Sequence, residues 1–259
     1  MLLYFKYMAV LLKSQMAYRF SFLLLTAGQC LTPFTVFAGL AFLFDRFGAV
    51  RGWSFHEVAL VFAVTHLAFS ITECFARGFD TFSSLVAGGG FDRLLVRPRS
   101  TVVQVLGSRF EFSRAGRLAL GAAVLIWAAA GVDVDWGPLR IAVLALTIAG
   151  GIAVFAGIFI LTAAISFWTI QGLEIANVLT DGGREMAQYP LTIYRRWTIR
   201  FFTYVIPFGC VNYLPLQYIL GREEGAPLHA LAPLIGFAFL VPCLAVWRIG
   251  VRHYRSTGS

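Results

Sequence analysis

The sequence predicts an all-α integral membrane protein with six transmembrane helices. Of its 259 residues, 59% are hydrophobic and 13% are charged, whereas a soluble domain carries about 25% charged residues. Apolar runs of about 20 residues, the length that crosses a bilayer, recur along the chain between short loops. Basic residues gather on alternate loops, as the positive-inside rule describes for polytopic proteins. We therefore expect a single membrane domain over residues 1–259.

The first segment, residues 1–19, is expected to form an interfacial helix that carries Lys6, Lys13 and Arg19. A signal peptide is not expected, because no short apolar region is followed by small residues at a cleavage site. The six spans are expected at residues 20–44, 55–79, 102–132, 141–168, 201–220 and 228–247. Six spans place both termini on the same side of the membrane.

The fifth apolar run, residues 201–220, is interrupted by two prolines and a glycine, so a straight helix is not expected there. We expect a broken or re-entrant outer half, whose irregular backbone must be buried in protein or line a cavity. The preceding segment, residues 171–200, is polar, and Gly182 and Gly183 are expected to interrupt any helix in it.

The distribution of basic residues predicts the orientation. On the side of the termini we expect Lys6, Lys13, Arg19, Arg77, Arg93, Arg97, Arg99, Arg109, Arg114, Arg117, Arg184, Arg195, Arg196, Arg200, Arg248, Arg252 and Arg255. On the other side we expect only Arg46, Arg51, Arg140 and Arg222. Both termini and the segments 88–100 and 171–200 are therefore expected in the cytoplasm.

The second span carries a polar stripe, His66, Ser70, Glu73, Arg77 and Asp80. Spacings of four, three, four and three residues place these side chains on one helical face, and polar residues at membrane depth face the bundle interior. Two interpretations of His66 and Glu73 stay open: hydrogen bonding between helices, or a proton relay. No further ligands at close spacing indicate a metal site.

Motifs for catalysis are missing from the sequence. A phosphate-binding P-loop requires Gly-Lys-Ser/Thr, and the only lysines, Lys6 and Lys13, do not follow a glycine. Neither His-Glu-x-x-His nor Gly-x-Ser-x-Gly occurs. We expect no catalytic residue, no ATPase site and no cofactor in this chain.

The most polar connection between two spans is residues 88–100. Three glycines end the preceding helix, a short amphipathic segment follows at 91–96, and Pro98 ends that segment. One interpretation is a helix that docks onto a soluble partner; the other is a basic cytoplasmic loop.

A second aromatic stretch contains Tyr204, Pro207, Phe208, Asn212 and Tyr213. Aromatic side chains on proline-broken backbone at membrane depth suit the lining of a pathway for an amphipathic substrate. Together with His66, Ser70 and Glu73 of the second span, these five residues are the eight expected for a substrate pathway. Aromatic anchoring at the membrane surface explains the same pattern equally well.

Three sets of motifs carry a family resemblance. They are residues 3–7 with 18–20 before the first span, Gly90-Phe91-Asp92-Arg93-Leu94-Leu95-Val96-Arg97-Pro98 after the second, and Tyr189-Pro190-Leu191-Thr192-Ile193-Tyr194 with residues 204–208 and 212–215. On these motifs the chain resembles, over essentially its whole length, the permease subunits of ATP-binding-cassette (ABC) exporters of type 2. The resemblance implies an N-terminal elbow helix, six spans, a cytoplasmic coupling helix and a re-entrant fifth span.

The resemblance also implies a function and partners. Two permeases, identical or similar, would each dock onto a separate nucleotide-binding subunit that holds ATP and magnesium, in the bacterial inner membrane. Phe91 with Leu94 or Leu95 would supply the apolar anchor of this contact, and Asp92, Arg93 and Arg97 would orient it. Membrane lipid is a further expected partner, and nucleic acid is not expected to bind.

Three alternatives stay open. The first is an ion-coupled secondary transporter that uses His66 and Glu73, which inverted repeats would support. The second is an intramembrane enzyme, for which no nucleophile and base are recognisable. The third is an ABC-driven assembly or signalling subunit. The sequence does not identify a substrate.

Overall fold

The computed structural model describes residues 2–169, 173–222 and 226–255. Within these ranges the regular structure is helical, apart from one isolated bridge between Val50 and Trp53. The predicted all-α class is therefore confirmed.

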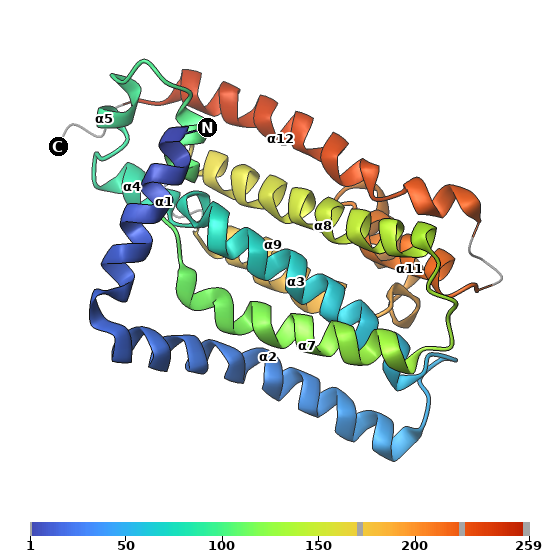
Figure 1. The fold of residues 1–259 in the computed structure, drawn as a ribbon. Coiled ribbons are helices and arrows are strands. Elements are labelled where there is room, and N and C mark those ends of the chain that lie inside the picture. The colour runs from blue at the N-terminus through green and yellow to red at the C-terminus, as the bar shows by residue number, and fades with distance from the viewer. Residues whose placement is uncertain (1, 170–172, 223–225, 256–259) are drawn as a thin grey trace.

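Five long helices lie side by side and form the body of the molecule (Figure 1). They are α2 (Arg19–Phe47), α3 (Phe55–Asp80), α7 (Ala115–Gly131), α8 (Pro138–Ile165) and α12 (Leu234–His253). In the described part of the chain, these five helices belong to the stretches that are long and apolar enough to cross a membrane. The structure thus supports an integral membrane protein with several spans.

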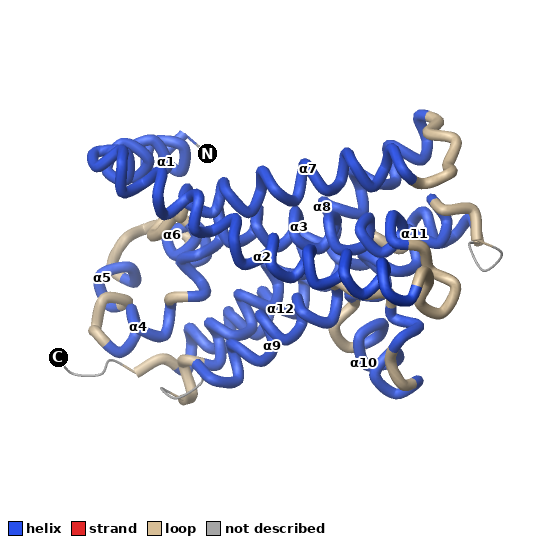
Figure 2. Tube along the Cα trace, turned by 90° about the horizontal axis from the view of Figure 1, so that it is seen from below, coloured by secondary structure: helices blue, strands red, loops and turns tan. Residues whose placement is uncertain are grey.

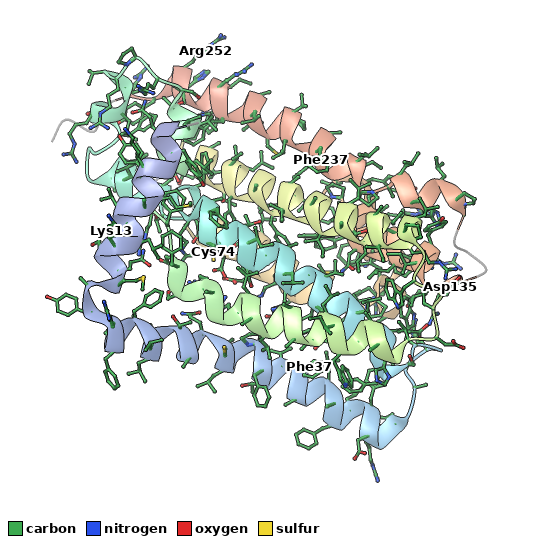
Figure 3. The ribbon with its side chains drawn as sticks, in the orientation of Figure 1. Lys13, Phe37, Cys74, Asp135, Phe237 and Arg252 are labelled. Carbon is green, nitrogen blue, oxygen red and sulfur yellow. The ribbon has the colours of Figure 1, made fainter. Side chains whose placement is uncertain are left out.

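The helix bundle has two ends, which we name by the parts of the chain found there. At the near end lie α1 (Leu2–Gln15), the short helices α4 (Phe82–Ala87) and α5 (Asp92–Leu95), and the end of α12. The far end holds the connections 48–54 and 132–137. Figure 3 shows Lys13 and Arg252 at the near end and Asp135 at the far end.

The central helix is α3, most of whose side chains are buried. It begins with a capping box, in which the Ser54 backbone N–H donates to Glu57 Oε2 (2.7 Å) and Ser54 Oγ accepts from the Glu57 backbone. Small residues let its neighbours approach closely. A Cβ on Gly121 of α7 would lie 3.2 Å from Leu67, and one on Gly151 of α8 would lie 2.8 Å from Ala68.

Buried apolar side chains form two clusters along the bundle. Near-end aromatic residues include Phe79, Phe82 and Trp247. The far-end cluster joins Trp53 and the first turns of α3 to Leu216 of the later chain. Where water would otherwise reach these side chains, burial of their apolar surface stabilises the fold. The two clusters also connect residues from the beginning and end of the chain to α3.

The third span differs from the prediction of residues 102–132. The segment after 100 forms the separate helix α6 (Thr101–Leu106), then an irregular stretch and the 3₁₀ turn η2 (Phe112–Arg114), before α7 begins. The reason is contact with α3: a Cβ on Gly78 would lie 1.8 Å from the Val105 carbonyl oxygen, so α6 crosses α3 there instead of continuing straight into the span.

The fifth span differs most from the prediction. The segment 201–220 does not form a crossing helix but the pieces α10 (Arg196–Tyr204), the π-helix η4 (Gly209–Tyr213) and α11 (Leu214–Ile219). Figure 2 shows α10 and α11 at the end of the bundle opposite α4 and α5. The expected interruption is therefore present, and its pieces lie at the far end, opposite the termini, where the broken outer half was expected.

A different helix, α9 (Leu173–Ala187), returns the chain from the near to the far end beside α3 (Figure 1). The expectation of a polar near-side loop interrupted at Gly182 and Gly183 is wrong. The helix continues through both glycines. Gly183 has a packing role within it, since a Cβ at this position would lie 2.8 Å from the Phe208 ring. After α9 the 3₁₀ turn η3 (Leu191–Ile193) lies at the far end.

Because of this path, three arginines lie at the opposite end of the bundle from the one predicted. Arg51 Nη1, in the far-end connection, donates to the carbonyl oxygen of Thr192 (2.7 Å). Arg195, Arg196 and Arg200 follow directly, and so they lie at the far end and not on the side of the termini. The near end still holds most of the basic residues, but the asymmetry is smaller than the sequence predicted.

The last span begins at Leu234 and not at residue 228, because the 3₁₀ turn η5 (Pro227–Leu231) and Pro233 precede it. At this start α12 packs tightly on α8: a Cβ on Gly236 would lie 2.4 Å from the Gly150 carbonyl oxygen. The first, second and fourth spans match their predicted ranges closely, and α2 continues through Pro33 without a break.

Candidate functional site

The polar stripe of α3 is buried inside the bundle. His66, Ser70 and Glu73 are each less than 5% exposed. Because α3 lies between α7, α8 and α9, the stripe faces these neighbours and not lipid. The sequence-based expectation that the stripe forms one interior face therefore matches the structure.

Glu73 is the centre of a network of ion pairs. Its carboxylate pairs with Arg117 of α7 (2.8 Å), Arg114 of η2 (3.4 Å) and Arg77 of its own helix (3.4 Å). Arg77 also pairs with Asp80. A buried carboxylate is tolerated only when opposite charges and hydrogen bonds compensate it, and here three arginines do so.

Glu111 extends the network to the near end, just before the span that begins at Phe112. It pairs with Arg114 (3.1 Å), Arg109 (3.2 Å) and Arg77 (3.5 Å). Partial burial acts to raise the pKa of the Glu111 carboxyl, but the surrounding arginines outweigh burial and lower that pKa below its ordinary value. The carboxylate is therefore ionised at neutral pH.

A polar cavity of about 370 Å³ adjoins this network. Glu73, Arg114 and Arg117 line one part of it, and Asp181 and Arg184 of α9 line another. Arg184 pairs with Asp181 (3.5 Å) and with the exposed Glu185 (2.6 Å). Charged side chains of α3, α7 and α9 thus surround one polar cavity, large enough for several water molecules.

His66 has a different partner from Glu73. Its Nε2 lies 3.0 Å from Oε1 of the buried Gln188, just after α9. Ser70, between His66 and Glu73 on the same face, has no hydrogen-bond partner for its Oγ among the described residues. Of the two open interpretations of His66, hydrogen bonding between helices is the arrangement observed.

Only part of the aromatic stretch joins this polar face. Asn212 of η4 donates from Nδ2 to Thr65 Oγ1 (2.7 Å) and to the carbonyl oxygen of Ala187. Tyr204 is 82% exposed at the far end, whereas Phe208 is buried against Phe155.

The other two members of the stretch belong to the far-end packing. Tyr213 packs on Trp53 with ring centroids 6.2 Å apart, and Pro207 is buried. The structure therefore does not bring the eight residues of the expected substrate pathway into one site.

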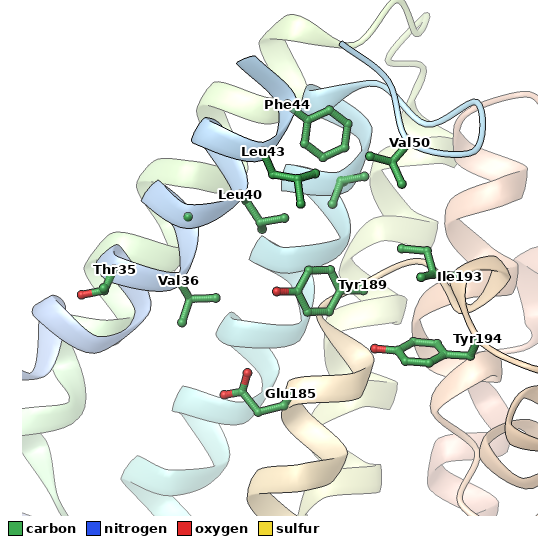
Figure 4. Close-up of a pocket in the computed structure, with 12 residues that line it drawn as sticks. Thr35, Val36, Leu40, Leu43, Phe44, Val50, Glu185, Tyr189, Ile193 and Tyr194 are labelled. Carbon is green, nitrogen blue, oxygen red and sulfur yellow. The ribbon is translucent and has the colours of Figure 1, made fainter. Parts of the chain in front are cut away.

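A larger groove of about 650 Å³ lies between α2 and the end of α9 (Figure 4). The α2 side is apolar and includes Val36, Leu40 and Phe44; Glu185 and Tyr194 lie on the other side. Burial raises the pKa of Tyr194, which is outside the long spans, to about 12, so its hydroxyl is neutral at physiological pH.

Sequence reasoning missed this groove and the partner Gln188, because it treated residues 171–200 as a loop. One signal was present. Thr180, Gly183 and Ala187 are small residues spaced by three and four, as on a helix that packs closely against its neighbours, and all three are buried.

The near-end segment contains the expected short helix, α5, but not the expected anchor. Phe91 is 0% exposed and packs on Phe82, Phe167 and Tyr254 with ring centroids 5.1, 5.4 and 5.0 Å away. The expectation that Phe91 reaches into a partner is therefore wrong for this conformation, because its own chain covers it.

The exposed apolar side chains of this segment are Leu95 (41%) and Val96 (83%). Arg93 and Arg97 are exposed beside them, while Asp92 and Leu94 are half-buried. The surface that α5 offers to solvent is thus a small apolar patch between two positive charges.

In the described ranges no group of three or more His, Cys, Asp or Glu side chains is arranged to hold a metal ion. No curated protein and no solved structure shows significant similarity to the chain. A family model described as ABC-2 family transporter protein matches residues 30–258, which includes all five long helices in whole or in part. The chain therefore belongs to the ABC-2 family of transporter proteins.

Proposed function

We propose that this chain is the permease subunit of an ABC exporter, and that it moves its substrate with energy from ATP hydrolysed on a separate subunit. Membership of the ABC-2 family supports a membrane component that works with an ATP-binding subunit. The single structural observation that carries the proposal is the arrangement around α5. Leu95 and Val96 are exposed on its outer side, while Phe91, directly before the helix, is buried in the near-end cluster.

The contact with the ATP-binding subunit is proposed at the exposed side of α5. Leu95 and Val96 would enter an apolar groove of the partner, and Arg93 and Arg97 would select a partner surface of negative charge. ATP and magnesium would be held by that partner. On this proposal the near end, which still carries most of the basic residues, faces the cytoplasm.

Phe91 gives this contact a mechanical connection to the spans. Its ring packs on Phe167, directly after α8, and on Trp247 of α12 (centroids 5.4 and 6.3 Å apart). Close-packed side chains transmit a displacement because the interior contains little free volume. A movement of α5 on ATP binding would therefore move the near-end halves of α8 and α12 together.

The proposed substrate route uses the 650 Å³ groove beside α2 and the polar cavity at Glu73. An apolar wall near a set of charged groups suits an amphipathic molecule. A second permease, identical or similar, would complete the route. Ion-coupled transport by His66 and Glu73 is not favoured, because Gln188 and three arginines already satisfy these two side chains.

The test is co-purification of the tagged chain with a P-loop ATPase identified by mass spectrometry, using two matched variants. Val96→Asp places a charge in the exposed patch of α5, and Leu228→Asp places the same charge on an equally exposed apolar residue (74%) of the far end. We expect Val96→Asp to reduce ATPase recovery and substrate export at least about tenfold, with little effect of Leu228→Asp. Equal recovery with both variants would refute docking at α5.

A further inference from the structure

A second groove, of about 590 Å³, lies at the near end between α1 and residues 94–108. The wall formed by α1 consists of Tyr4, Tyr7, Val10 and Leu11, which spacings of three and four residues place on one helical face. The opposite wall includes Val103 of α6. Both walls are therefore mainly apolar or aromatic.

The rim of this groove is positively charged. Arg97 and Arg99 line it, and the hydrogen bond from the Arg99 N–H to the Arg97 carbonyl oxygen (2.7 Å) holds them in one tight turn. No carboxylate belongs to the lining, and in the described part of the chain neither arginine forms an ion pair with one. Burial raises the pKa of Tyr4 to about 12, so this phenol adds no negative charge.

The groove lies where the surface of a bilayer is expected. Helix α1 runs across the near ends of the long helices (Figure 1). Directly after it, Phe20, Leu23 and Leu24 of α2 are exposed apolar residues, as on a helix face in contact with lipid. On the other wall, the span containing α7 begins at Phe112, shortly after the groove residue Ser108.

We propose that this groove binds an anionic phospholipid, with the phosphate between Arg97 and Arg99 and an acyl chain along the α1 wall. Basic pockets at the cytoplasmic edge of membrane helices attract acidic head groups, and arginine binds phosphate oxygens with two parallel hydrogen bonds. Free phosphate would use the arginines alone and leave the apolar walls uncovered. The inference does not depend on export, because it concerns the chain by itself.

The experiment compares lipids bound to the purified full chain by native mass spectrometry. Phosphatidylglycerol and phosphatidylcholine with the same acyl chains are the probes, in the presence and absence of inorganic phosphate. We expect phosphatidylglycerol to be retained at least about tenfold more than phosphatidylcholine, and inorganic phosphate not to displace it. Equal retention of the two lipids, or displacement by inorganic phosphate, overturns the proposal.

Two variants locate the binding. Arg97→Gln with Arg99→Gln removes the charge, and Val103→Trp fills the groove while keeping both arginines. Each is expected to lose the tightly held phosphatidylglycerol. Arg195→Gln with Arg196→Gln removes two exposed charges at the far end and is expected to keep it.

Thermal unfolding of each variant shows whether the fold is kept. Loss of lipid from the far-end variant, or retention by Val103→Trp when this variant is folded, places the lipid elsewhere and overturns the proposal.

Discussion

Glu73 of α3 and Arg117 of α7 form a 2.8 Å ion pair inside the bundle. The pair joins two spans, and Arg114 and Arg77 share the same carboxylate. Removal of one partner from a buried ion pair leaves uncompensated charge, which costs more than the pair contributes.

Glu73→Gln is therefore expected to lower the free energy of unfolding by about 3 kcal/mol, because three arginines lose their shared carboxylate. Chemical denaturation in mixed micelles measures this change. Asp45→Asn removes the same charge from an exposed position and is expected to change stability by less than about 0.5 kcal/mol. Equal effects of the two substitutions would show that the network does not stabilise the bundle.

The two adjacent glycines of α9 are expected to respond in opposite directions to alanine. At Gly182 nothing lies within 4 Å of an added Cβ, so Gly182→Ala is expected to stabilise the helix by up to about 1 kcal/mol. At Gly183 the Cβ would lie 2.8 Å from the buried Phe208 ring.

Overpacking of this kind costs about 1–3 kcal/mol, so Gly183→Ala is expected to lower the thermal unfolding temperature in detergent. If both substitutions raise the unfolding temperature, α9 does not pack on Phe208 as described.

Substitution of Phe91 is expected to lower the stability of the fold, and not only to weaken partner binding. Because Phe91 is fully buried among aromatic rings, Phe91→Ala is expected to cost about 3–5 kcal/mol. Val96→Ala, on the exposed side of α5, is expected to leave stability unchanged within about 0.5 kcal/mol. A stable Phe91→Ala protein that fails only in ATPase binding would instead support the original expectation of a projecting anchor.

The ion pairs of Glu111 are expected to weaken in acid. The pKa of this carboxyl in the folded protein is lowered relative to the unfolded chain, so its stabilisation is present above the unfolded value of about 4.5 and is lost as the pH falls through the lower folded value. Thermal unfolding of the wild type and of Glu111→Gln between pH 7 and pH 3.5 measures this contribution. The difference between the two proteins should shrink toward the acid end, and a constant difference would exclude the assignment.

The sequence predicted those helices whose apolar composition agrees with the apolar surroundings of a membrane span. Helices α2, α3 and α8 are long apolar runs, and each lies close to its expected range. The polar stripe of α3 was also predictable, because a helical repeat of charged residues inside an apolar span has only one interior face on which to be buried.

The failure at α9 has a physical cause. The sequence of α9 is typical of a loop because it contains the charged residues Asp181, Arg184 and Glu185. In the structure, part of this helix is accommodated inside the bundle by charged residues of α3 and α7 and by a polar cavity. Hydropathy measures one segment at a time and does not include the partner charges that other segments supply. The match of Tyr189–Tyr194 to the family motif was present in the sequence, but its place at the far end was not.

The burial of Phe91 could not be predicted from the sequence for a similar reason. An amphipathic segment identifies an apolar side that must be covered, but not whether the cover comes from the same chain or from a partner. Here Phe82, Phe167, Trp247 and Tyr254, three of them more than 75 residues away along the chain, supply the cover. Only the packed structure brings these residues together.

The central claim, that an ATP-binding subunit docks on α5, is tested most directly by site-specific photo-crosslinking. A photoreactive amino acid is placed at Val96 or, as the matched control, at Leu228 in membranes of cells that produce the complete transporter. We predict an adduct between position 96 and a subunit that contains a P-loop, and none from position 228. No such adduct from position 96, or the same adduct from position 228, would contradict the account.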